Sequence, residues 1–149
     1  MMKYLLALSI LLFTNSAIAE PPTPDLLGIH LGGTVQQAER ACRKHGGKWF
    51  TSQMNLFACK SSGFNATVEA NGNSVVFRVF VAFKQVKFYN KELKSFILNY
   101  SALRSTETGA NNTVINNFVN DKWVTNFESY GNNGNYSAHL YNIKEMLNK

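Results

Sequence analysis

The chain has 149 residues, with 15 lysines and arginines against 9 acidic residues, a formal net charge of +6, and two cysteines. This length suffices for one domain with a hydrophobic core. Two cysteines without a C-x-x-C spacing argue against a zinc site or a redox pair, so we expect no metal and no cofactor. Because no nucleic-acid recognition motif accompanies the positive charge, we also expect no nucleic-acid partner.

The first 19 residues have the pattern of an export signal. Lys3 supplies a short basic segment, residues 4–13 are almost entirely apolar, and Ala17-Ile18-Ala19 is an A-x-A cleavage site. The apolar run is too short to span a bilayer as a mature helix. We therefore predict a periplasmic or secreted protein, cleaved after Ala19 and without a transmembrane segment once the signal is removed.

The mature chain divides into a leader and one domain. Residues 20–27 contain all three prolines and predict an extended leader. Residues 28–149 form the predicted domain, and we find no sequence repeat at a fixed period in it.

The first element of the domain is a helix over residues 34–45. Thr34 and Gln37 have the spacing of a capping box, in which each side chain bonds the backbone N–H of the other residue. The apolar residues that follow recur at helical spacing and place Cys42 on the buried side of the helix. Gly46-Gly47 favours a left-handed helix end.

Residues 48–60 predict two short strands joined near residues 53–55. Cys59 lies on the second of these strands. An exported protein retains disulfides, so we predict a structural bridge between Cys42 and Cys59. The loop that it closes is short, and the entropic model assigns such a bridge roughly 3 kcal/mol.

Alternating apolar residues predict further strands over residues 64–70 and 75–84. The second of these is largely apolar on both faces, which indicates a central strand covered on both sides over part of its length. Asn90 is the predicted cap of a second helix, whose apolar residues from Leu93 to Leu103 form one stripe. Residues 105–120 are rich in asparagine and predict a loop.

Two more strands, over residues 123–128 and 136–140, and a short terminal helix complete the prediction. The element order is α-β-β-β-β-α-β-β. The predicted fold class is therefore α+β, with an antiparallel sheet of about five to six strands, two main helices packed on one face and one disulfide.

Positive charge is concentrated in the middle of the chain. From Glu39 to Arg104 there are 11 basic and 3 acidic residues. This excess favours an anionic partner such as lipopolysaccharide, glycan or an acidic protein, although a solvated basic surface would give the same pattern. The candidate anion-binding residues are Arg40, Arg43, Lys44, Lys84, Lys87, Lys91 and Lys94.

Aromatic residues beside turns are the candidates for contact with a partner protein, because tyrosine and tryptophan supply large contact areas at low entropic cost. They occur near the predicted hairpin turn and near the glycine- and asparagine-rich turn of the last two strands. Core packing is the alternative for the tryptophan. The candidate partner-binding residues are Trp49, Gln53, Met54, Asn55, Tyr130, Tyr136 and His139.

No catalytic motif is present. The three histidines, His30, His45 and His139, have no metal-binding spacing, no serine lies in a G-x-S-x-G motif, and the carboxylates do not pair. We therefore predict no catalytic residues and a protein that is not an enzyme. A hydrolase that depends on His30 or His139 is the least favoured alternative.

Residues 28–38, GIHLGGTVQQA, have the form G-[IM]-x-L-G-x-[ST] followed by a capped helix. This start resembles that of the β-lactamase-inhibitor-protein-like group, which also includes small lipoproteins of outer-membrane assembly. The resemblance implies a non-enzymatic, protein-binding role and transfers no binding residue. We predict an inhibitor, immunity or exclusion protein that acts on another periplasmic or toxin protein. A basic module that binds the anionic envelope surface is the alternative.

Overall fold

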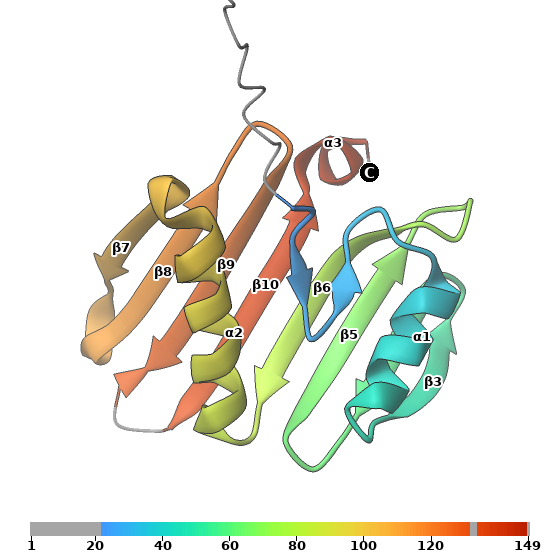
Figure 1. Ribbon diagram of the computed structural model, residues 1–149, viewed down its shortest axis with the longest axis horizontal. Coiled ribbons are helices and arrows are strands. Elements are labelled where there is room, and N and C mark those ends of the chain that lie inside the picture. Colours follow the sequence, from blue (N-terminus) through green and yellow to red (C-terminus); the bar gives the residue numbers. More distant parts are fainter. Residues whose placement is uncertain (1–21, 132–133, 149) are drawn as a thin grey trace, which may run out of the picture.

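The computed structural model describes residues 22–131 and 134–148. The predicted export signal lies outside these residues. Within them, one antiparallel sheet of eight strands forms the body of the molecule, in the order β3-β4-β5-β6-β10-β9-β8-β7 (Figure 1). Its strands are β3 Lys48–Gln53, β4 Leu56–Lys60, β5 Phe64–Ala70, β6 Val76–Phe83, β7 Arg104–Thr108, β8 Thr113–Val119, β9 Trp123–Tyr130 and β10 Asn135–Asn142.

The remaining elements are shorter. A two-stranded hairpin pairs β1 (Asp25–Leu26) with β2 (Ile29–His30). The helices are α1 Val35–Lys44, α2 Val86–Tyr100 and α3 Ile143–Leu147, with 3₁₀ turns η1 Ser101–Leu103 and η2 Ala110–Asn112. Helices α1 and α2 lie across the same face of the sheet, and the β1–β2 hairpin lies between them (Figure 1).

The predicted fold class was wrong. In place of a sheet of five to six strands with two main helices packed on it, the described chain is mostly sheet, with eight strands in one sheet, two in another and three short helices. The largest error is the predicted loop over residues 105–120, which forms most of β7 and all of β8. Every residue of β7 is exposed, so this edge strand lacks the apolar alternation by which strands are recognised.

The second helix also begins earlier than predicted. Gln85, not Asn90, is the N-cap of α2, and its side chain makes no capping hydrogen bond. The side-chain signal on which the prediction relied is therefore missing at the true start of the helix.

The element order repeats within the chain. Helix α1 precedes β3 to β6, helix α2 precedes β7 to β10, and β6 pairs with β10 where the two halves meet. Val81 and Ala138 are register partners where the two halves meet. Two strands outward from Val81 the register reaches Cys59 of β4, and two strands outward from Ala138 it reaches Asn116 of β8, so these two residues occupy corresponding positions. The repetition is therefore one of topology and not of sequence.

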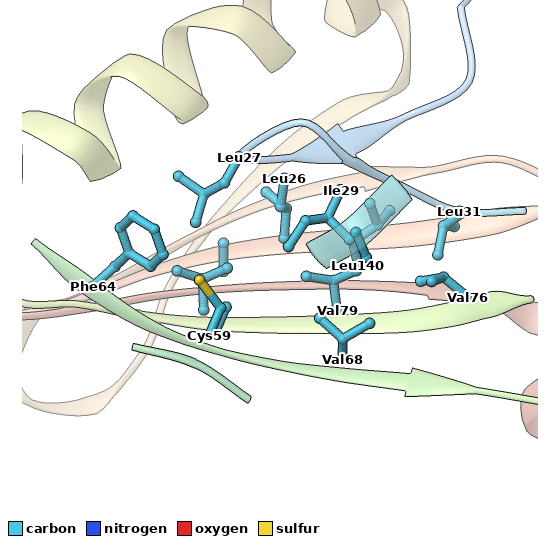
Figure 2. Packing of buried hydrophobic residues seen from close by; sticks show 14 of the residues in the cluster. Leu26, Leu27, Ile29, Leu31, Cys59, Phe64, Val68, Val76, Val79 and Leu140 are labelled. Atoms are coloured by element: carbon cyan, nitrogen blue, oxygen red, sulfur yellow. The ribbon is translucent and has the colours of Figure 1, made fainter. Parts of the chain in front are cut away.

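The core lies between the sheet and the elements that cover it. Figure 2 shows Leu26, Leu27 and Ile29 of the β1–β2 hairpin above the sheet residues Val79 and Leu140. These side chains are almost fully buried, so the hairpin forms a lid over the sheet between the two helices.

A buried carboxylate holds this hairpin against α2. Glu92 of α2 is buried, and its Oε2 accepts a hydrogen bond of 3.0 Å from the backbone N–H of Leu27. Leu27 has a positive φ of 58° at the hairpin turn. Burial raises the pKa of Glu92, so the site favours the protonated acid relative to an exposed glutamate.

The predicted start and bridge of α1 are confirmed. Thr34 Oγ1 accepts from the N–H of Gln37 at 3.1 Å, and Gln37 Oε1 accepts from the N–H of Thr34 at 2.9 Å. Cys42 and Cys59 form a disulfide with Cα atoms 5.8 Å apart. A Cβ on Gly47 would lie 2.6 Å from the sulfur of Cys59, so the bridge requires glycine at this position.

Candidate functional site

The candidate site lies on the sheet face opposite α1 and α2, which we call the open face. Side chains alternate between the two faces of a strand, and in β6 the buried Val79 and Val81 point toward the helices. The residue between them, Phe80, therefore points to the open face, and it is 38% exposed. The cross-strand row through it is Phe50, Ala58, Thr67, Phe80, His139, Asn126, Asn117 and Ser105.

An arginine connects two side chains at the centre of the open face. Arg78 of β6 donates from Nε to His139 Nε2 of β10 at 2.6 Å. It also donates from Nη1 to Glu69 Oε1 of β5 at 2.9 Å. The side chains of Arg78 and Glu69 are 32% and 19% exposed, so the ion pair is partly shielded from water and holds the guanidinium in place.

Aromatic rings flank the imidazole of His139. The centroid of the Phe80 ring lies 5.8 Å away in an edge-to-face arrangement, and that of Tyr141 lies 5.2 Å away. These distances are typical of favourable aromatic pairs. The centre of the open face is thus an ordered, partly exposed group of rings around one arginine.

Beside this group lies an open hollow of about 420 Å³. The Tyr130 hydroxyl donates to the Glu128 carboxylate at its rim. The hollow is lined by Phe80, Ala82, Phe83, Asn126, Glu128, Tyr130, Asn135, Tyr136, Ser137 and His139. Its walls combine rings with amide, hydroxyl and carboxylate groups, a mixture suited to contact with a polypeptide surface.

The environment of His139 keeps its imidazole neutral. Burial, and after it the positive charge of Arg78, lower the pKa of His139, while Glu128 and Glu69 act in the opposite direction. The lone pair of Nε2 accepts from Arg78, so the proton of the neutral ring is on Nδ1. In this arrangement neither ring nitrogen has a free lone pair with which to remove a proton from a substrate.

The first prediction concerns this histidine. In the unfolded chain His139 takes up a proton as the pH falls through about 6.5, whereas its lowered pKa keeps it neutral in the folded protein. Its contribution to stability should therefore be fully present above pH 6.5 and be lost as the pH falls toward the folded-state pKa. We expect His139→Gln, whose amide oxygen can accept from Arg78, to lack this loss.

The measurement is urea unfolding between about pH 8 and about pH 5, roughly 1.5 units on either side of the pKa of histidine in the unfolded chain. The difference in free energy of unfolding between wild type and variant isolates His139, because the pKa of His45 is also lowered and affects both proteins equally. A difference that does not change with pH would show that the interaction does not distinguish the two protonation states.

The structure places the predicted partner-binding residues in three regions. Tyr130 and His139 line the hollow on the open face. Tyr136 also borders this hollow, but it shares its strand face with the buried Ala138, and its ring packs on Tyr89 of α2 at 4.9 Å. Trp49 lies on the opposite side of the sheet, where its ring stacks on Phe57 at 5.5 Å and packs against the core. The hairpin turn, with Met54 90% exposed, lines a separate hollow of about 510 Å³ at the end of the sheet. Gln53, Met54 and Asn55 are its contributors from that turn.

The predicted anion-binding residues separate as well. Arg43 donates to Glu39 from Nη2 at 2.7 Å, so its charge is compensated. Arg40 lies on α1 and Lys94 on α2, away from the ends of these helices. The lysines Lys44, Lys84, Lys87 and Lys91 lie where α1 ends and α2 begins.

The sequence prediction missed three residues at the centre of the open face, namely Glu69, Arg78 and Phe80. The signal was present, since the second face of the strand through Phe80 is partly apolar. We interpreted this face as covered. In the structure Phe80 remains 38% exposed, so an apolar residue opposite the core face of a central strand indicated a surface rather than a second core layer.

In the part of the chain that the structure describes, no group of three histidine, cysteine or acidic side chains could hold a metal ion. None of its helices is long and apolar enough to cross a membrane. No protein-family model, curated protein or solved structure matches this chain.

Proposed function

We propose that this protein is an exported, non-enzymatic module that binds another protein through its open face. In this proposal it acts as an inhibitor, immunity or exclusion protein on an envelope or toxin protein. The observation that carries the proposal is the partly exposed group of Phe80, His139 and Tyr141 around the anchored Arg78.

This group has the physical properties of an interface centre. Aromatic residues and arginine are enriched where protein interfaces are most buried, and charged groups there require partners. Here Glu69 and His139 already hold Arg78, so binding would not leave its charge unpaired. The rings lie on paired strands and would lose little conformational freedom on binding.

Two sequence features support the same proposal. The export pattern of residues 1–19 and the Cys42–Cys59 disulfide favour a periplasmic or secreted location, where disulfides persist. The resemblance at residues 28–38 to the β-lactamase-inhibitor-protein-like group implies a protein partner.

A hydrolase is the less favoured function, because the Nε2 lone pair of His139 is occupied by Arg78. Hydrolysis that is lost in His139→Ala or His30→Ala would favour it over the binding proposal.

The second prediction tests the open face directly. The protein, expressed with its full sequence so that any signal is processed, is immobilised and exposed to envelope extract from its own host. We expect one dominant partner that remains bound at high salt. Phe80→Ala should weaken the affinity for this partner by about tenfold or more, as expected for a central interface residue.

Leu98→Ala is the matched control, because Leu98 is an apolar residue that is 72% exposed on α2, on the other side of the sheet. It should leave the affinity unchanged. Equal loss in both variants, or no loss in Phe80→Ala, would remove the open face as the binding site. If no protein is retained from the extract, the protein-binding proposal itself fails.

A further inference from the structure

Six lysines gather at one end of the molecule, which we call the basic end. Helix α1 ends there, β3 begins, β4 and β6 end, and α2 begins, along the lower edge of Figure 1. All six side chains are exposed. They are Lys44, Lys48, Lys60, Lys84, Lys87 and Lys91.

Two of these lysines are neighbours on adjacent strands. Lys48 of β3 and Lys60 of β4 are direct register partners, which places like charges on neighbouring strands. Such a pair is destabilising. The ammonium of Lys60 instead lies over the ring of Phe50, 5.7 Å from its centroid.

The other lysines continue from this pair toward α2. The Nζ of Lys84 donates to the carbonyl of Ser61 at 2.8 Å, which places Lys84 beside the residue after Lys60. Lys87 and Lys91 follow at helical spacing on α2. The charges of Lys91 and Lys44 both help to lower the pKa of His45, so both lysines lie near that histidine.

Salt bridges do not neutralise the charge of the basic end. Among the described residues the ion pairs are His30–Asp25, Arg43–Glu39 and Arg78–Glu69, and none involves these six lysines. Exposed apolar side chains lie among the charges. Val86, in the first turn of α2, is 44% exposed, and Phe50 is 46% exposed.

We propose that the basic end docks on a membrane surface of anionic phospholipid. The lysines are spread over α1, β3, β4, α2 and the turn between β6 and α2. They do not converge on one ligand, so their charge complements a diffuse layer of headgroups. Val86 and Phe50 supply apolar groups that can enter the boundary between headgroups and acyl chains. This inference goes beyond the proposed function, because it rests on the lysines at one end of the strands and not on the group around Arg78. Phe50 also belongs to the cross-strand row through Phe80.

The third prediction is measured by cosedimentation with vesicles of phosphatidylcholine containing about one third phosphatidylglycerol. Wild-type protein, expressed with its full sequence, should bind these vesicles and not vesicles of pure phosphatidylcholine. Binding should weaken steeply between about 0.05 and about 0.5 M salt. Each lysine near such a surface contributes about a fivefold gain, so Lys84→Gln/Lys87→Gln/Lys91→Gln should bind about a hundredfold more weakly.

The matched control removes the same three charges elsewhere. Arg40→Gln/Lys94→Gln/Lys144→Gln has the same net charge, with Lys144 on α3, which lies in Figure 1 at the end of the strands opposite the basic end. It should retain most of the binding. An equal loss in the two triple variants would overturn the proposal, because net charge and not the basic end would then govern binding.

A second variant separates binding from folding. Lys48→Gln/Lys60→Gln removes a like-charge pair and should not lower stability, yet it should weaken vesicle binding by more than tenfold. Unchanged binding in this variant, equal binding to pure phosphatidylcholine, or tighter binding to soluble heparin than to the vesicles would each overturn the lipid proposal. None of these outcomes depends on Phe80, so the two proposals can fail separately.

Discussion

Replacing Cys42 and Cys59 together by alanine should lower the free energy of unfolding by roughly 3 kcal/mol, the value that the chain-entropy model gives for a loop of about this length. The two cysteines are 17 positions apart, and both are buried, with exposed fractions of 1% and 0%. The bridge joins α1 to β4. Without the bridge, α1 keeps its capping box, but only the few apolar residues on one side of the helix attach it to the sheet.

The measurement is equilibrium unfolding in urea of the oxidised wild type and the double variant. A loss of this size would be a large part of the free energy of unfolding of a domain, which is commonly about 5–15 kcal/mol. Native protein treated with a mild reductant is the control, because a buried bridge should resist reduction until the protein unfolds. A difference below about 1 kcal/mol would show that α1 is held by packing alone.

Phe127→Ala should lower the free energy of unfolding by about 3–5 kcal/mol, the range observed when a buried phenylalanine is removed. Phe127 of β9 is 0% exposed. Its ring centroid lies 5.1 Å from that of Phe96, 5.9 Å from Tyr89 and 6.1 Å from Phe118. Phe127 thus joins α2 to the second half of the sheet.

This half has no disulfide among its described residues. At the position that corresponds to Cys59, Asn116 accepts from Arg104 Nη2 at 2.7 Å, and the attachment of α2 relies on aromatic packing. Phe80→Ala is the control for Phe127→Ala in urea unfolding. Phe80 is 38% exposed on the open face, so its truncation should cost less than about 1 kcal/mol. Similar losses at both positions would contradict our distinction between core face and open face.

The pair of phenylalanines also bears on function. A large apolar residue that contributes little to stability and faces water is a candidate for binding. If Phe80→Ala leaves stability unchanged and abolishes partner capture, the open face is retained for recognition and not for folding.

Several local features of this protein follow from residues that are close together in the chain. The start of α1 follows from Thr34 and Gln37, which bond each other's backbone within three residues. The bridge follows from the presence of two cysteines in a chain with an export pattern. The β3–β4 hairpin was predictable because its two strands are adjacent in the chain and the residue pattern of each strand is local.

Strands β7 and β8 and the two surfaces depend on contacts between distant parts of the chain. Strand β7 has no apolar side, and it is a strand because β8 supplies its hydrogen-bond partners. Asn116 is buried because Arg104 and Thr106, on another strand, satisfy its oxygen. His139 and Arg78 are 61 positions apart and meet through the β6–β10 register. The lysines of the basic end likewise come together because five elements, α1, β3, β4, β6 and α2, begin or end there. Such positions depend on pairing between distant segments, and no local pattern of residues specifies that pairing.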